Sequence, residues 1–184
     1  MRTFFALDLT PKAKIAIDQW RSKTQPFQEG KVPMANFHIT LCFNGKTTQQ
    51  QLQQLQAGAD SISVEAFALT LNEFGYWTKP SISFIAPREI PTQLISLHNN
   101  LQRLSRQQGL STEKRQYMPH VTLCRRLQQP PAPPLFAPEF QLEFQGFSLF
   151  ESVNHKDKVQ YNPIFSWQLK SSKSVRERLA SGEF

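Results

Sequence analysis

The sequence contains little cysteine, no long apolar run and few acidic side chains. Cys42 and Cys124 are the only two cysteines in 184 residues, which is typical of a reducing compartment rather than of a disulfide-stapled secreted domain. No stretch of about 18 apolar residues is present that would span a membrane. The apolar N-terminal segment is broken at Asp8 and Pro11, unlike a signal peptide. We therefore expect a cytoplasmic protein without membrane association.

The charged side chains are mostly basic. Lys and Arg number 21 and Asp and Glu number 14, so the net charge is +7, which favours an anionic partner such as RNA, a nucleotide or a phosphate ester. Part of this charge lies in residues 170–178, so basicity alone is a weak indication. With 39% apolar residues, including fifteen Phe, the chain can form a globular core. We expect a single catalytic domain over residues 1–170 and a basic tail over residues 171–184, for which disorder is one interpretation.

Capping signals and hydrophobic periodicity predict an α+β fold. Thr10 and Thr48 have the surroundings of helix N-caps, and Pro91 opens a leucine-rich helical pattern. In the first helix, Ile15 and Ile17 are expected on the apolar face. Helices are predicted over residues 11–25, 48–62 and 91–109. Strands are predicted over residues 3–8, 36–43, 64–74, 81–86, 140–150 and 159–169, with a candidate hairpin loop at 154–158 and a proline-rich connector at 130–138.

One short sequence motif occurs twice. The pattern His-x-Thr-Leu-Cys spans residues 38–42 and returns at residues 120–124. Because side chains alternate across a strand, His38, Thr40 and Cys42 should share one face. The second copy places His120 and Thr122 in the same relation. The other face of the first copy should carry the apolar residues Ile39, Leu41 and Phe43.

The repeat predicts two lobes related by a pseudo-dyad, with a site in the cleft between them. Histidine titrates near neutrality, so one imidazole can accept a proton from water while the other protonates a leaving oxygen. Threonine hydroxyls can donate hydrogen bonds to phosphate oxygens as charge develops on them. This scheme needs no metal or other cofactor, and a ribose 2′,3′-cyclic phosphate suits it.

The repeat has two other interpretations, a structural role for each histidine and a metal site. A histidine on a half-exposed strand is usually structural, but the match between the two copies favours a shared chemical role. A Cys2His2 metal site is disfavoured, because Cys42 and His38 would lie about 13 Å apart along a strand, beyond the reach of one ion. Of the remaining histidines, His98 is expected at the surface or boundary of its helix, and His155 in a solvated loop.

The chain resembles the 2H phosphoesterases, and among them the RNA 2′,3′-cyclic phosphodiesterases that are also called 2′-5′ RNA ligases. The resemblance covers about residues 2–169 and is specific, because the paired motif defines that superfamily. It implies a two-lobed, pseudo-symmetric fold with antiparallel or mixed sheets lining a central cleft and helices outside. The segments that carry it are residues 2–7 (RTFFAL), 36–41 (NFHITL), 75–77 (GYW), 119–123 (PHVTL), Arg125 and 147–152 (FSLFES), continuing to Tyr161.

The resemblance also implies roles for individual residues. Arg125 matches a basic residue that lies against the nucleotide, and it is favoured over Arg126, whose side chain faces the opposite way on a regular strand. Phe84 occupies a position where relatives carry an aromatic residue that can stack on the base. The resemblance favours His120 as base and His38 as acid. The catalytic quartet it implies is His38, Thr40, His120 and Thr122.

The expected function is metal-independent hydrolysis of RNA or nucleotide 2′,3′-cyclic phosphates to 2′-phosphates. The expected partners are RNA 2′,3′-cyclic phosphate ends or cyclic nucleotides, bound by a monomer. One alternative is reversible 2′-5′ RNA ligation, which needs the same quartet. Another is a non-catalytic nucleotide- or RNA-binding module, against which the intact His and Thr of both motifs argue.

Overall fold

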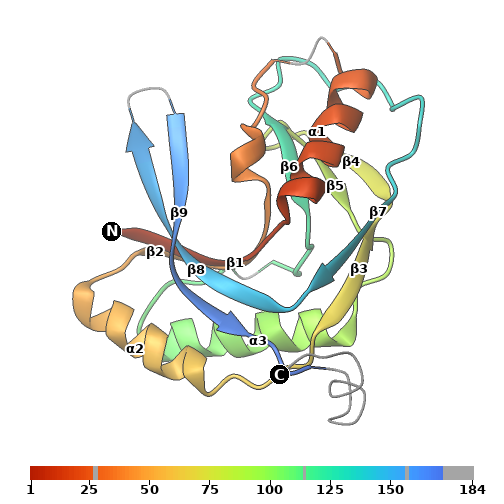
Figure 1. Ribbon diagram of the computed structural model, residues 1–184. Coiled ribbons are helices and arrows are strands. Elements are labelled where there is room, and N and C mark those ends of the chain that lie inside the picture. The colour runs from red at the N-terminus through yellow and green to blue at the C-terminus, as the bar shows by residue number, and fades with distance from the viewer. Residues whose placement is uncertain (27–28, 114, 156–157, 172–184) are drawn as a thin grey trace.

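The computed structural model describes residues 1–26, 29–113, 115–155 and 158–171. The strands form three antiparallel groups with helices packed outside them (Figure 1). Among the helices described, none combines the length and apolar composition needed to cross a bilayer. The predicted tail over residues 171–184 lies outside the described residues except for Ser171, as do residues 156–157 of the predicted hairpin loop.

The first lobe is built on a four-stranded sheet with the order β2-β1-β8-β9. The central strand β1 is buried along its whole length apart from its end residues. Helices α2 and α3 lie side by side beneath this sheet (Figure 1). The elements of this lobe are β1 (Arg2–Asp8), β2 (His38–Lys46), β8 (Gly146–His155), β9 (Lys158–Gln168), α2 (Gln49–Asp60) and α3 (Thr92–Gln107).

The second lobe is built on a three-stranded sheet with the order β4-β5-β6, and a two-stranded sheet, β3-β7, lies beside it. Helix α1 covers this lobe (Figure 1). A 3-10 turn, η1 (Met34–Asn36), then leads into β2. The elements are α1 (Pro11–Thr24), β3 (Phe67–Leu71), β4 (Glu73–Trp77), β5 (Ile82–Ala86), β6 (Val121–Arg125) and β7 (Phe140–Phe144).

Helices α1 and α3 each pack against the lobe that does not contain the strand preceding them in the sequence. Helix α1 follows β1 in sequence, but its Trp20 packs against Phe74 of β4 and Phe140 of β7, with ring centroids 6.2 and 6.1 Å apart. Helix α3 follows β5, yet it packs against β2 of the first lobe. One cluster of buried apolar side chains consequently runs through both lobes. This exchange of helices between the lobes fixes the position of one sheet relative to the other, and with it the shape of the cleft between them.

The predicted helix starts are confirmed. The Thr10 hydroxyl accepts a hydrogen bond from the Ala13 amide (3.2 Å), and Thr48 forms a complete capping box with Gln51. The expectation that Ile15 and Ile17 share an apolar face is wrong, because residues two apart on a helix point about 200° away from each other. Ile17 is buried, whereas Ile15 is 46% exposed.

Two segments predicted as single strands are each divided in two. Residues 64–74 contain β3 and the start of β4, with Asn72 between them, and residues 140–150 contain β7 and the start of β8, with Gln145 between them. At both points the chain leaves the β3-β7 pair and enters a larger sheet. A Cβ at Gly146 would lie 2.5 Å from the Trp167 carbonyl oxygen, so glycine allows the close approach at the second change. At both breaks the apolar alternation shifts by one residue, from Leu71 to Phe74 and from Phe144 to Phe147, and this shift was a signal of the change of sheet.

Candidate active site

The first motif lies at the start of β2, and a β-bulge interrupts it. Opposite β2, Phe5 pairs with Cys42 and Ala6 pairs with Thr40, so Leu41 is the extra residue. The bulge reverses the alternation that the sequence predicted beyond Thr40. Cys42 therefore turns into the core, where it lies 3.5 Å from the Ser105 hydroxyl, and Phe43 becomes 51% exposed.

The second motif contains the same bulge at the equivalent residue. Ser83 pairs with Cys124 and Phe84 pairs with Thr122, which leaves Leu123 as the extra residue of β6. Cys124 is fully buried as a result, and Arg125 turns to the face that carries Thr122, whose hydroxyl oxygen lies 3.4 Å from Nη2 of Arg125. Both copies of the motif thus contain a β-bulge at the same position. The bulge in β6 explains why Arg125 rather than Arg126 lines the cleft.

Both motif histidines are oriented by the carbonyl two residues before them. Nδ1 of His38 lies 2.7 Å from the Asn36 oxygen, and Nδ1 of His120 lies 2.7 Å from the Met118 oxygen. A carbonyl only accepts, so each Nδ1 carries the proton and each neutral ring has Nε2 as its acceptor. The Thr40 hydroxyl then donates to Nε2 of His38 over 3.1 Å. Two basic nitrogens are thereby fixed in equivalent orientations.

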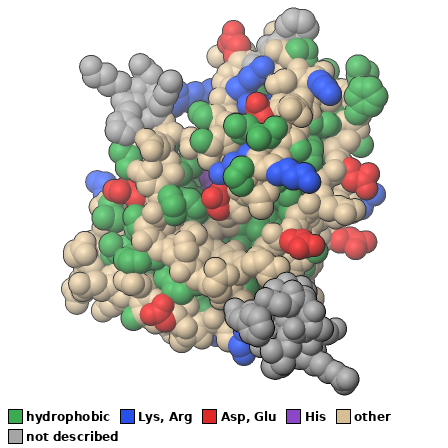
Figure 2. Space-filling model, in the orientation of Figure 1, with side chains coloured by type: hydrophobic (Ala, Val, Ile, Leu, Met, Phe, Trp, Pro, Cys, Tyr) green, Lys and Arg blue, Asp and Glu red, His purple; other side chains and the backbone are tan. Residues whose placement is uncertain are grey.

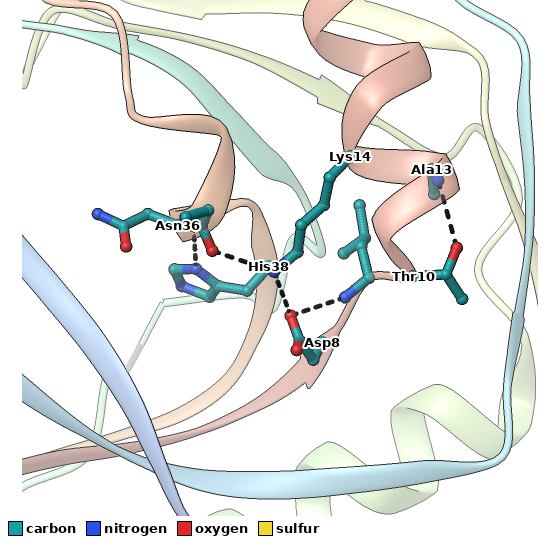
Figure 3. A network of polar contacts seen from close by, with 8 residues as sticks. Asp8, Thr10, Ala13, Lys14, Asn36 and His38 are labelled. Carbon is teal, nitrogen blue, oxygen red and sulfur yellow. Dashed lines mark hydrogen bonds and ion pairs between the residues drawn. The ribbon is translucent and has the colours of Figure 1, made fainter.

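A polar network holds the turn that orients His38 (Figure 3). Lys14 of α1 pairs with Asp8 at 2.7 Å and donates to the Ala35 carbonyl at 3.0 Å. The Asn36 side chain donates to the Val159 carbonyl on β9 at 2.6 Å. The position of η1, and therefore of the carbonyl that orients His38, is set from both sides by α1 and β9.

Aromatic rings pack on both histidines. The His38 ring lies 5.0 Å from the rings of both Phe4 and Tyr161. The His120 ring lies 4.7 Å from Trp77 and 5.6 Å from Phe84, in edge-on contacts. These rings exclude water from the imidazoles and leave each of them half-buried, facing the cleft.

Burial lowers the pKa of both imidazoles. Desolvation lowers the pKa of His38 to about 4, and the positive charge of Arg125 lowers it further. Desolvation also lowers the pKa of His120, and Arg125 again contributes. Both rings are therefore neutral at pH 7 while the cleft holds no anion, so an anion that enters between them should raise both pKa values.

The two motifs open into one cavity of about 490 Å³ between the lobes. In the space-filling view, histidine is visible only as a small area in the hollow near the middle of this face, close to both basic and acidic side chains (Figure 2). In the part of the chain that the structure describes, no three His, Cys, Asp or Glu side chains gather closely enough to hold a metal ion. The predicted residues that line the cavity are His38, Thr40, His120, Thr122 and Arg125.

Phe84 is buried behind the cavity wall, whereas stacking on a base would require its ring to be exposed in the cavity. Its ring is only 6% exposed and packs 4.1 Å from the Trp77 ring, behind His120. Glycine at position 75 allows this packing, because a Cβ there would overlap the Phe84 ring. Trp77, which is half-buried and lines the cavity, presents the aromatic surface that we expected from Phe84.

Two further cavity residues were not expected there. His98 and Tyr117 stack with ring centroids 3.8 Å apart and planes 8° apart, and both line the cavity. Nδ1 of His98 lies 2.7 Å from the Leu41 carbonyl oxygen, and the Tyr117 hydroxyl donates to the Thr40 carbonyl at 3.0 Å. The spacing of His98, four residues after Leu94, was a signal that it faces inward with the leucines.

Comparisons with known proteins agree with this architecture. Residues 9–145 match the family described as the 2′-5′ RNA ligase superfamily. The RNA 2′,3′-cyclic phosphodiesterase of Escherichia coli (strain K12) is 29% identical over 169 residues, which are 91% of this chain and 96% of that protein. The enzyme of the same name from Bacillus subtilis (strain 168) is 29% identical over 160 residues, covering 80% and 86% of the two chains.

A solved structure shares the fold closely. Escherichia coli LigT in complex with 3′-AMP superposes with a TM-score of 0.85 at 30% identity, covering 91% of this chain and 97% of that one. The agreement in sequence and in fold extends over both lobes and both motifs. This chain belongs to the 2′-5′ RNA ligase superfamily.

Proposed function

We propose that this protein hydrolyses 2′,3′-cyclic phosphates at RNA ends, and the corresponding cyclic nucleotides, to 2′-phosphates. The observation that carries the proposal is the presence, in one cavity, of two imidazoles with matching Nε2 orientation and two threonine hydroxyls. The names of the Escherichia coli and Bacillus subtilis relatives support the substrate class. The complex of LigT with 3′-AMP supports a nucleotide ligand for this fold.

The reaction uses the two imidazoles in opposite protonation states. A neutral Nε2 accepts a proton from water as the water oxygen forms a bond to phosphorus. The bond between phosphorus and O3′ breaks, and the other imidazole, protonated, delivers its proton to O3′. The phosphate stays on O2′, so the product is a 2′-phosphate. Thr40 and Thr122 donate hydrogen bonds to the non-bridging oxygens, on which charge accumulates.

We assign His120 as the base and His38 as the acid. Because the pKa of His38 in the empty cavity is about 4, it is protonated at neutral pH only when an anion lies beside it. The phosphate of the substrate supplies that charge. Binding and protonation of the acid are therefore linked, and His38 becomes ready to donate a proton when the substrate arrives.

Arg125 and Trp77 are suited to bind the nucleotide. Arg125 lies beside Thr122 with its guanidinium in the cavity, where it can pair with the phosphate. The Trp77 ring is next to His120 and can stack on a base. Phe84 supports the Trp77 ring from behind rather than stacking on the base itself.

Alanine substitution of each histidine tests the proposal. His38→Ala and His120→Ala should each lower the kcat for adenosine 2′,3′-cyclic phosphate by about 10²–10⁴, the usual contribution of a general acid or base. A matched pair at position 40, Thr40→Ser and Thr40→Val, separates the hydroxyl from the shape of the side chain. Near-normal turnover in either histidine variant would contradict the assigned roles. Binding without turnover by the unmodified protein would favour the non-catalytic module instead.

A further inference from the structure

A second cavity, of about 330 Å³, opens beside the one that holds the two motif histidines. The two cavities share a wall to which His98 and Gln102 of α3 and Tyr117 contribute. Arg106, near the end of α3, lines the second cavity but not the first. We call the space bounded by these four residues the outer groove. A ligand too long for the first cavity can continue directly into it.

The shared wall is a rigid aromatic surface. The parallel rings of His98 and Tyr117 are each fixed by a hydrogen bond to the carbonyls at the bulge of β2, over 2.7 and 3.0 Å. Both side chains are half-buried, so part of each remains open to the cavities. Rings that are held in place before binding lose little conformational freedom when they contact a ligand. Such surfaces suit unpaired bases, since every base has a flat face.

The outer groove also contains a fixed positive charge. The Arg106 guanidinium donates to the Thr112 hydroxyl at 2.8 Å and to the Gln102 amide oxygen at 2.7 Å. Among the residues that the structure describes, no carboxylate forms an ion pair with it. Glu113, which also lines the second cavity, pairs with Arg115 at 2.8 Å. A guanidinium held by neutral groups keeps its charge available for a phosphodiester.

We propose that the outer groove binds the second nucleotide of an RNA end, on the 5′ side of the nucleoside that carries the cyclic phosphate. This inference rests on the proposed function. In such an end the cyclic phosphate occupies both O2′ and O3′ of the terminal nucleoside, so the chain continues only through O5′. The neighbouring base contacts the His98 and Tyr117 wall, and the phosphate that joins the two nucleotides pairs with Arg106.

Two substrates of different length test the inference. Adenosine 2′,3′-cyclic phosphate fills only the first cavity, whereas the dinucleotide ApA with a terminal 2′,3′-cyclic phosphate reaches the groove. For the unmodified protein, kcat/KM for the dinucleotide should exceed that for the mononucleotide by about fivefold or more, the effect expected of one stacked base.

A matched pair of arginines on α3 locates the effect. Arg106→Gln keeps a polar side chain but removes the charge, so the dinucleotide advantage should fall by the share that the contact to the joining phosphate supplies, while stacking on the His98 and Tyr117 wall remains. The salt slope of log KM for the dinucleotide should also become shallower by about 0.7, since one phosphate contact is lost. Arg103→Gln is the control, because Arg103 is exposed, bonds only Asn100 at 2.8 Å among the hydrogen bonds described, and lines neither cavity. It should keep the advantage of the unmodified protein.

The outcomes separate the two proposals. If the mononucleotide is not hydrolysed, the proposed function itself fails. If the mononucleotide is hydrolysed and the dinucleotide has no advantage, the inference about the groove fails and the function stands. If the advantage exists but Arg106→Gln leaves it and the salt slope unchanged, the second nucleotide lies elsewhere and the inference is overturned.

Discussion

At the scale of single residues, each motif histidine has one nitrogen committed to the fold and one left for chemistry. The carbonyls of Asn36 and Met118 hold Nδ1–H, so Nε2 is the basic atom in both rings. Since aromatic neighbours exclude water, both imidazoles are neutral at pH 7 in the empty cavity. The proton needed by the acid must therefore be taken up from solution as the substrate binds.

That proton uptake is measurable. The His120→Ala variant should bind adenosine 2′,3′-cyclic phosphate and take up a proton at pH 7, because the phosphate anion raises the pKa of the remaining motif histidine, His38. Isothermal titration calorimetry in buffers of different ionisation enthalpy would measure the number of protons. The double variant with His38→Ala is the control and should take up none. A binding enthalpy independent of the buffer in His120→Ala would contradict the assignment of His38.

At the scale of elements, the two motifs are joined by a direct contact. The Tyr117 hydroxyl, three residues before His120, donates to the Thr40 carbonyl on the edge strand β2. β2 is the edge strand of its sheet, and the Thr40 and Leu41 carbonyls accept hydrogen bonds from Tyr117 and His98. This connection helps to set the separation of the two catalytic strands.

Removing only the hydroxyl tests this connection. Tyr117→Phe should lower the free energy of unfolding by about 1–3 kcal/mol, the cost of leaving a carbonyl without its partner. It should also lower kcat about fivefold with little change in KM, because the ring remains and only the spacing of the motifs relaxes. Urea unfolding and steady-state kinetics measure the two effects. Tyr76→Phe on β4 is the matched control. Equal kcat values for Tyr117→Phe and that control would show that the contact does not position the motifs.

What the sequence could predict is visible at these two scales. The capped starts of α1 and α2, the buried β1 and the paired His and Thr residues follow from local signals, namely caps, apolar runs and an exact repeat. The bulges at Leu41 and Leu123 could not be predicted, because the alternation of apolar and polar residues does not show where one strand contains an extra residue. They changed the predicted faces of Cys42 and Phe43.

Other features depend on contacts between distant segments. The exchange of α1 and α3 between lobes is set by which sheet each segment joins. For the same reason the burial of Phe84 behind Trp77 required the register of β4 against β5. His98 is the instructive exception, since its place on the leucine-rich face of α3 was readable from its spacing.

At the scale of the whole molecule, the buried histidines of the site make the folded state less stable at acidic pH. The pKa values of His38, His98 and His120 are all lowered by burial in the folded state. The unfolded chain therefore binds protons below about pH 6.5 while the folded chain does not. Stability is retained above that pH and is lost as the pH falls from about 6.5 towards the lowered values.

His38 should contribute a measurable share of this loss. For the unmodified protein, the free energy of unfolding should be smaller at pH 5 than at pH 7, and His38→Gln should reduce the difference by on the order of 1 kcal/mol. Urea titrations at the two pH values measure it. An equal difference in both proteins would mean that the environment of His38 does not lower its pKa.

The central claim is that two histidines open a cyclic phosphate towards the 2′ side without a metal. The most direct test is hydrolysis of adenosine 2′,3′-cyclic phosphate in the presence of EDTA, with the product isomers separated by chromatography. The account predicts undiminished turnover and adenosine 2′-monophosphate as the product, because O3′ is the leaving atom. Formation of the 3′-monophosphate, or loss of turnover in EDTA that added metal restores, would contradict it.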